Sequence, residues 1–197
     1  MAITSKIDSS EIGKSTGGTS PYINDLKDLT ELKFRVIGDI QVGYQYFQEI
    51  TREDGTQGVK PVRSEEYPDT LENPAKKYQS EERVDRATQF MAMAIYDFSD
   101  NKIKIWNLSK KSVISSLMEV ENDEDTGEIQ DYDFKVKKSG NGLETEYALL
   151  RLDKTDVTPE MQKAYEDANV DLKAYLNGES GIGEKATKEV DPSEIDF

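Results

Sequence analysis

The sequence predicts a mostly β protein with a few helices, and the middle of the chain carries the clearest pattern. Residues 90–96 are apolar at nearly every position, which indicates a strand with both faces covered. Residues 103–108 alternate, with Lys104 and Trp106 on one face, and a polar turn joins the two strands. A helix with one apolar stripe follows Ser109, its expected N-cap. A strand pair and then a helix is the order in which a five-stranded OB-fold barrel places its third strand and helix, so we expect that barrel.

The chain before this middle part predicts a flexible arm and two further strands. Residues 1–30 are polar and rich in glycine near their centre, which is typical of a disordered segment. Residues 33–40 alternate, and Gly38 stands where a β-bulge would bend the strand. Residues 44–50 are expected to form its hairpin partner. They carry aromatic side chains on both faces, so periodicity leaves the inward face open.

A long polar connection, residues 52–89, separates these strands from the central pair. Loops of this length are often functional in compact domains. Within it, residues 59–63 are expected to form an edge strand, which tolerates Pro61, and residues 81–89 a helical turn. After the central helix, residues 121–131 form an acidic loop whose glycine is misplaced for an EF-hand calcium site.

The last part of the chain predicts a hairpin, a helix and a tail. Residues 132–138 and 144–152 alternate around a Ser-Gly-Asn-Gly turn. Thr158 is expected to cap a helix that ends at Asn177 and packs with its apolar stripe on the barrel, whose loops are extended. The expected division is a flexible N-terminal arm at 1–30, an OB-fold domain at 31–155, a packed C-terminal helix at 156–178 and a flexible acidic tail at 179–197.

The composition narrows the class of protein. A chain of 197 residues with 35% hydrophobic content suffices for one domain of usual size with extensions. It has no Cys and no His, which excludes disulfides and the Ser-His and Cys-His triads and removes the commonest metal ligand. We therefore expect no enzyme and no cofactor. The N-terminus lacks a signal-peptide core and no apolar run reaches about 18 residues, so we expect a cytoplasmic protein without a membrane partner.

The formal net charge of −15 argues at first sight against a nucleic-acid partner. Residues 153–197 carry 5 basic and 12 acidic side chains, so about half of the excess lies in the last quarter of the chain. The expected strands carry the cations Lys33, Arg35, Lys104, Lys135 and Lys137. Because contact depends on the local sign of charge, an acidic total is compatible with a basic groove.

Aromatic and basic side chains on neighbouring strands are what an unpaired nucleic-acid strand requires. Bases stack on aromatic faces for about 1–3 kcal/mol each, while Lys and Arg follow the phosphates. Lys104 beside Trp106 meets this requirement, and the other strand cations lie on adjoining strands. The same residues equally fit a core Trp and lysines that protect sheet edges.

The C-terminus gives a second signal. A flexible acidic tether that ends in an aromatic residue with a free carboxylate suits capture by a basic pocket on a partner protein. It could also fold back over its own groove, and a merely solubilising tail is the alternative. The residues expected to contact a partner are Asp191, Glu194, Ile195, Asp196 and Phe197.

Together these segments resemble phage-type single-stranded DNA-binding proteins, an OB-fold group with an acidic C-terminal tail ending in Phe. The matching segments are FRVIGDIQVGYQYF, KPVR, residues 90–117, residues 131–150 and the closing DPSEIDF. The resemblance implies a groove that binds single strands with little sequence preference and a tail that recruits replication and recombination proteins. It implies that Trp106, Tyr44 and Tyr46 line the groove with nearby basic residues. The full expected DNA-binding set is Lys33, Arg35, Tyr44, Tyr46, Arg63, Lys104, Trp106, Lys135, Lys137 and Tyr147.

Three functions are weighed on these grounds. The first is a protein of replication, recombination and repair that coats unpaired DNA, in which oligo-dT would quench Trp106 and deletion of residues 179–197 would strengthen binding. It could act as a homo-oligomer. The second is a protein-interaction or virion-structural module on the same barrel, which burial of Trp106 and its strand neighbours would favour. The third is a Mg²⁺-dependent nuclease, which the runs of acidic residues on loops disfavour.

Overall fold

The computed structural model describes residues 20–23, 26, 30–76, 84–123, 125, 127–140 and 144–183. Within them the chain is mostly β, as the sequence predicts, with three α-helices. The elements in order are β1 (Tyr22–Ile23), β2 (Glu31–Thr51), β3 (Gln57–Ser64), β4 (Thr88–Asp97), β5 (Lys102–Leu108), α1 (Lys111–Glu121), a 3-10 turn (Ile129–Asp131), β6 (Tyr132–Ser139), β7 (Glu146–Lys154), α2 (Pro159–Ala168) and α3 (Leu172–Leu176).

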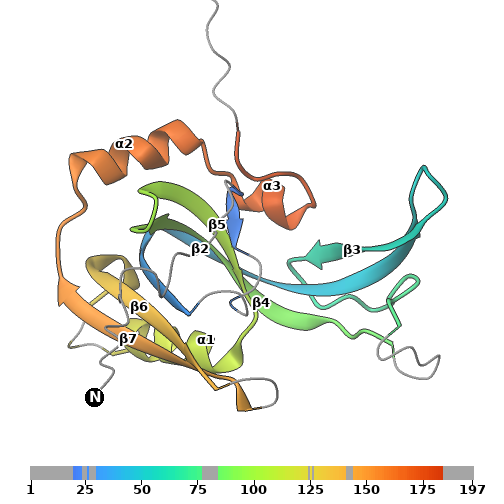
Figure 1. Cartoon of the computed structure of the whole chain (residues 1–197), viewed down its shortest axis with the longest axis horizontal. Helices are drawn as coiled ribbons and strands as arrows, with labels where there is room; N and C mark the ends of the chain where they lie inside the picture. The colour runs from blue at the N-terminus through green and yellow to red at the C-terminus, as the bar shows by residue number, and fades with distance from the viewer. Residues whose placement is uncertain are drawn as a thin grey trace, which may run out of the picture.

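The strands form a single mixed sheet (Figure 1). Its order is β1-β5-β4-β2-β6-β7, with β3 paired to β2, and every pair is antiparallel except β1 with β5. A closed barrel would need β5 to pair with β7. In the described part of the chain β5 pairs with β1 at that edge, and α1 packs beside β7. The sheet is therefore open, and the closed five-stranded barrel expected from the sequence is not formed.

β2 is one strand of 21 residues that serves both halves of the sheet. Its first half pairs with β6, its second half with β3, and β4 pairs with parts of both. The register shifts between Val36 and Ile40, where Gly38 has a φ of 77°, so the predicted bulge is confirmed. The predicted hairpin of residues 33–40 with 44–50 is wrong, because the strand continues through Gly43 and its second half pairs with β3. β3 itself confirms the predicted edge strand around Pro61.

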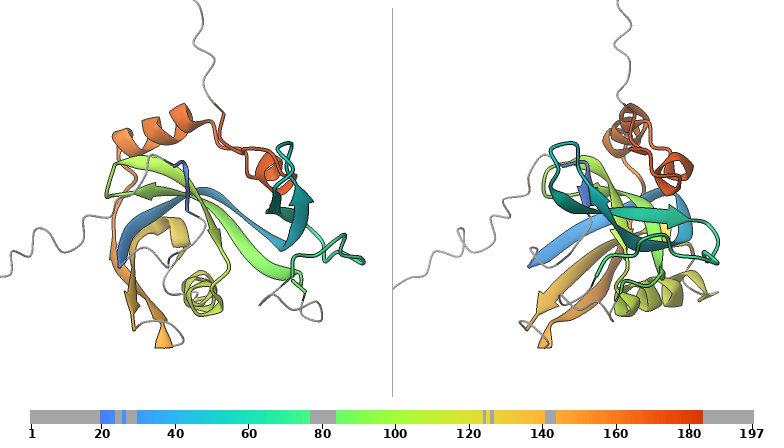
Figure 2. Two further views of the ribbon diagram at one scale, coloured as in Figure 1. Left: turned by 45° about the vertical axis from the view of Figure 1, so that its right-hand side comes forward. Right: turned by 90° about the vertical axis from the view of Figure 1, so that its right-hand side faces the viewer.

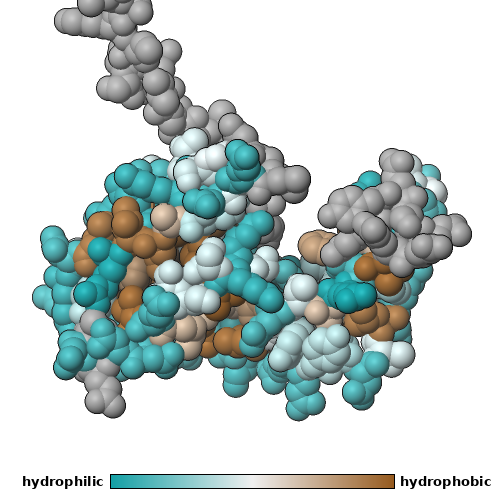
Figure 3. Space-filling view, turned by 90° about the horizontal axis from the view of Figure 1, so that it is seen from below, coloured by the Kyte–Doolittle hydropathy of each residue, from teal (hydrophilic) through white to brown (hydrophobic). Residues whose placement is uncertain are grey.

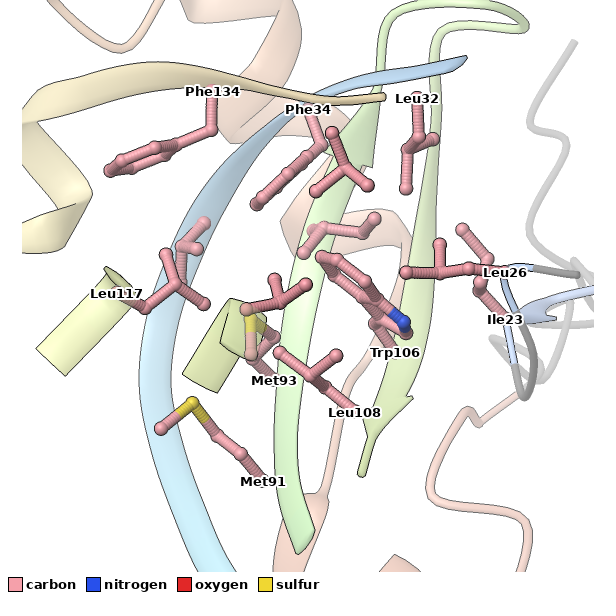
Figure 4. Packing of buried hydrophobic residues seen from close by; sticks show 14 of the residues in the cluster. Ile23, Leu26, Leu32, Phe34, Met91, Met93, Trp106, Leu108, Leu117 and Phe134 are labelled. Atoms are coloured by element: carbon pink, nitrogen blue, oxygen red, sulfur yellow. The ribbon is translucent and has the colours of Figure 1, made fainter. Parts of the chain in front are cut away.

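The main core lies between the sheet and α1 (Figure 4). Phe34 of β2 meets Trp106 of β5 edge-on, with ring centroids 4.9 Å apart, and stacks on Phe134 of β6 at 5.7 Å. Leu117 of α1 is fully buried in the same cluster. The predicted alternation along β5 does not separate a solvent-exposed face from a buried one, because every residue after Lys102 is buried.

The opposite face of the sheet is covered by the two C-terminal helices, so the sheet lies between them and α1 (Figure 2). α3 places Tyr175 and Leu176 against Phe90 of β4. α2 places Met161 in a cluster with Tyr96 at the other end of the same strand. Because α2 and α3 cover the outer surface of β4 and β5, a ligand cannot bind to that part of the sheet.

Helix boundaries differ from the prediction in two places. Thr158 caps α2 as predicted, and its hydroxyl accepts the Met161 N–H. The predicted single helix to Asn177 is instead two, because Asn169 adopts a left-handed φ of 45° and ends α2. α1 begins one residue later than expected, since Lys110 rather than Ser109 occupies its N-cap, and Lys110 makes no side-chain cap.

Two predicted segments fall partly outside the described residues. The helical turn at 81–89 is not formed where the chain is described, because Val84 bridges Lys76 and Thr88 begins β4. Of the predicted tail, residues 179–183 are described, and Ile182 bridges Val170 beside α3. The expected partner-binding residues Asp191, Glu194, Ile195, Asp196 and Phe197 lie outside the described residues.

Candidate nucleic-acid interface

Two of the predicted stacking residues lie inside the protein. Trp106 is 1% exposed and Tyr46 is 5% exposed. The Tyr46 hydroxyl accepts the Glu72 N–H at 3.1 Å, which holds the loop after β3 over the ring. Neither ring offers a free face to a base, so both side chains serve the core rather than a groove.

Two of the predicted cations are buried and held by oxygen atoms of the same chain. The Nζ of Lys104 lies 2.7 Å from Asp97 and 2.8 Å from Asp100. Burial opposes its charged form, but the hydrogen bonds to Asp100 and Asp97 outweigh burial and raise the pKa of Lys104 above its usual value. Arg35 is fully buried and donates to the carbonyl oxygens of Asp131 and Thr155. These two charges fix loops to the sheet and are not available to phosphates.

Three further predicted cations share the outer face of β2 and β6, as expected. Lys33 lies opposite Lys135 in the sheet, and Lys137 lies opposite Glu31. Each has a carboxylate partner: Lys33 contacts Asp133 at 3.3 Å, while Lys135 and Lys137 contact Glu31 at 2.8 and 3.9 Å. The strand pattern placed these lysines together but did not reveal the acids between them, which largely cancel their field.

The remaining predicted residues lie at three separate places. Tyr147 of β7 lies beside α1, with the Nζ of Lys110 5.5 Å from its ring centre. Arg63 of β3 places its guanidinium 4.1 Å over the ring of Tyr175, and its buried Nε has no hydrogen-bond partner. Arg63 therefore joins β3 to α3. Tyr44 reaches the open part of the sheet beside β3.

That open part is the arm made by the second half of β2 and by β3, which extends away from the rest of the sheet (Figure 1). The ring of Tyr44 meets the ring of Tyr67 edge-on, with centroids 5.3 Å apart. Tyr67 lies in the loop after β3 and is 60% exposed. Sequence reasoning missed Tyr67, although an aromatic residue in a polar loop between Pro61 and Pro68 was a usable signal.

The face of the arm that carries Tyr44 also holds a cation and a free amide. Alternation places Val42, Tyr46 and Gln48 on the same face as Tyr44, and their cross-strand partners share it; Tyr46 is covered by the loop that contains Glu72. Lys60 is the partner of Gln48, and Gln89 of β4 is the partner of Tyr44; both are exposed. We call the surface formed by Val42, Tyr44, Lys60, Tyr67 and Gln89 the arm surface.

The arm carries several large hydrophobic side chains that are exposed. Those of the arm and of the loops beside it are Val42, Phe47, Val59, Tyr67 and Val84. Seen from the α1 side, hydrophobic and hydrophilic atoms lie next to each other on the lobe that contains β2 and β3 (Figure 3). Arg52 and Arg86 add exposed cations there, and neither they nor Lys60 pair with a carboxylate of the described residues. Exposed rings beside unpaired cations are what base stacking and phosphate contact require.

No family model, no curated protein and no solved structure matches the chain. The described residues contain no cluster of carboxylates able to hold a metal ion. Among the same residues, no helix combines the length and apolar character that crossing a membrane requires. The assignment of function therefore depends on the geometry of the arm surface.

Proposed function

We propose that the protein binds single-stranded DNA through the arm surface, and so protects unpaired DNA in replication, recombination and repair. The observation that carries the proposal is the Tyr44–Tyr67 ring pair, which is accessible at the edge of a sheet with Lys60 on the same face. Stacking on such rings is tolerant of sequence because every base has a π-face. A cytoplasmic location follows from this role.

The order of the elements supports the proposal. β2, β4, β5, α1, β6 and β7 follow the sequence order of an OB-fold barrel, and the pairs β2–β4, β4–β5, β2–β6 and β6–β7 are those of that fold. We infer an OB-fold barrel opened between β5 and β7. OB folds bind oligonucleotides through the face of their second and third strands and the adjoining loops. Here the outer face of those strands carries α2 and α3, whereas the loop between the first and second barrel strands contains β3 and Tyr67.

The charge of the molecule sets the strength of binding that we expect. Lys60, Arg52 and Arg86 can meet a few phosphates, while Glu65 and Glu66 directly follow β3. With three or four phosphate contacts, the logarithm of the affinity should fall with the logarithm of salt concentration with a slope of about −2 to −3. Recruitment of replication or recombination proteins by residues 191–197 is part of the same proposal.

Fluorescence anisotropy of a labelled oligo-dT at low salt tests the proposal. Tyr67→Ala should weaken binding about 5- to 100-fold, which corresponds to the loss of one stacked base. Tyr67→Phe keeps the ring and should bind as the wild type does. Because Tyr67 is 60% exposed, neither change should unfold the protein. Equal affinities of all three proteins would contradict the proposal.

The second candidate is a protein-interaction module that does not bind nucleic acid. The burial of Trp106 and the pairing of Lys104 with two carboxylates favour it, because they remove the groove expected from the sequence. On this account the exposed apolar residues of the arm contact a protein. Absence of oligo-dT binding by the wild type at low salt would select this candidate.

A further inference from the structure

In the part of the chain that the structure describes, β7 is an edge strand of the sheet. It lies at the end of the strand order and, in the described residues, pairs only with β6. Its nine residues contain no Pro and no Gly, and Leu150 near its centre is 43% exposed. A long edge strand with apolar side chains is a template for pairing with another strand.

The register of β7 limits how a second strand can be added. Residues 146–151 pair regularly with β6, and an extra residue of β7 between Arg151 and Lys154 then interrupts the ladder. Pairing at the free edge is therefore regular only up to Arg151. Two copies related by a twofold axis perpendicular to the sheet place outer side chains opposite outer side chains. The twofold axis then passes through one residue of β7. Within residues 146–151, five regular pairs form only when that residue is Ala148 or Leu149.

We propose that two copies of the chain associate through antiparallel pairing of their β7 strands, centred on Leu149. This register sets Ala148 against Leu150 of the second copy, so both exposed apolar side chains are covered. On the inner face it sets Tyr147 against Arg151 of the second copy, a ring opposite a cation. Centring on Ala148 would instead set Leu150 against the carboxylate of Glu146, which is unfavourable.

Charge around the edge agrees with this register. A groove between α1 and β7 borders the free edge, and its lining residues are Ser116, Glu119, Val120, Asp123, Leu149 and Arg151. Pairing brings Arg151 of the second copy to the side of the sheet where Glu119 and Asp123 lie. β7 and β3 lie at opposite ends of the molecule, so the contact leaves both arm surfaces open (Figure 1).

Disulfide trapping tests the register, because the chain contains no cysteine of its own. Ala148→Cys and Leu150→Cys are made as separate proteins and oxidised mildly, alone and mixed. Opposed residues of paired strands lie about 4.5–5.5 Å apart at Cβ, close to disulfide geometry, whereas diagonal ones lie farther. The mixture should form a disulfide-linked heterodimer, and each single variant should form little disulfide-linked dimer. Trapping of either variant alone, or of neither combination, would overturn the proposal.

Sedimentation velocity of the untreated proteins provides a second test. The wild type should sediment as a dimer in a concentration-dependent manner, and Leu150→Lys should be monomeric at the same concentration because it places a charge against Ala148. Val157→Lys alters an apolar residue of similar exposure, 40%, outside β7 and should remain dimeric. A monomeric wild type, or equal masses of the two variants, would overturn the proposal. Oligo-dT binding is measured separately, so failure of the dimer does not affect the proposed function.

Discussion

Trp106 meets the edge of the Phe34 ring in the core, with centroids 4.9 Å apart and ring planes at 82°. The two residues come from β5 and β2, which are not neighbours in the sheet, so the contact spans the space between them. The only Trp of the chain therefore reports on folding rather than on a bound nucleotide. This relationship reverses the role that sequence reasoning gave to Trp106.

Replacement of Trp106 should accordingly destabilise the protein. Trp106→Ala removes a buried ring and leaves a cavity, which costs about 3–5 kcal/mol of unfolding free energy. Urea unfolding followed by circular dichroism measures the loss. In the wild type, Trp emission should shift to the red on unfolding and stay in place when oligo-dT is added. A stoichiometric quench by oligo-dT would instead place the ring at the nucleotide.

The protein should lose stability as the pH rises above about 10. Burial opposes the charge of Lys104, but the hydrogen bonds that its ammonium donates to Asp100 and Asp97 outweigh burial and raise the pKa of Lys104 above its usual value. Burial also raises the pKa of Tyr96. A group whose pKa is higher in the folded state contributes stability that is complete below its unfolded pKa and is lost as pH rises through the folded one. Urea midpoints should thus be level from about pH 7 to 9 and fall above about pH 10.

Lys104→Met provides the control for this pH dependence. It leaves the buried Asp97 without its cation, so the free energy of unfolding near neutral pH should drop by about 3–5 kcal/mol. Its decline above about pH 10 should be shallower than that of the wild type, because one titrating group has been removed. Parallel declines in the two proteins would show that Lys104 does not contribute.

Gly38 should tolerate no side chain. Its φ of 77° is in the left-handed region, and an added Cβ would overlap the hydroxyl of Tyr165 from α2. Gly38→Ala should therefore lower the free energy of unfolding by more than about 1 kcal/mol. Gly55 also has a positive φ, of 81°, but an added Cβ there meets nothing within 4 Å. Gly55→Ala is the matched variant and should lose less stability.

Removal of residues 184–197 should strengthen oligo-dT binding at low salt by a few-fold. The segment carries five carboxylate and two lysine side chains, so its loss reduces repulsion of phosphates and any competition for cations. The cut is placed after Gly183, because Ile182 still packs beside α3. Anisotropy titrations at two salt concentrations measure the effect. Unchanged affinity at low salt would show that residues 184–197 do not weaken DNA binding.

Local patterns in the sequence predicted most of the strands but not how they come together. Alternation and turn residues located β4, β5, β6 and β7, and Gly38 in β2 located its bulge. The same alternation divided β2 into two, because nothing in residues 41–43 distinguishes a turn from a continuing strand. Whether the sheet closes into a barrel could not be predicted from local patterns, since the pairing of β1 with β5 joins segments about eighty residues apart.

The site was harder to predict than the fold for a physical reason. Periodicity shows that Lys104 and Trp106 share a face, but burial of that face depends on α1 and on Asp97 and Asp100, which lie at the end of β4 and in the turn before β5. Lys33 and Lys135 were correctly placed together, yet Asp133 and Glu31 neutralise them through pairings between strands. Tyr67 was missed because it belongs to no periodic segment.

Photocrosslinking tests the central claim most directly. An oligo-dT that carries a halogenated uracil is bound at low salt and irradiated, and the crosslinked residues are identified by mass spectrometry. The account predicts crosslinks at Tyr44 and Tyr67, because their rings are the accessible stacking surfaces of the arm. Crosslinks confined to Tyr147 or Trp106, with Tyr44 and Tyr67 unmodified in the bound complex, would contradict it.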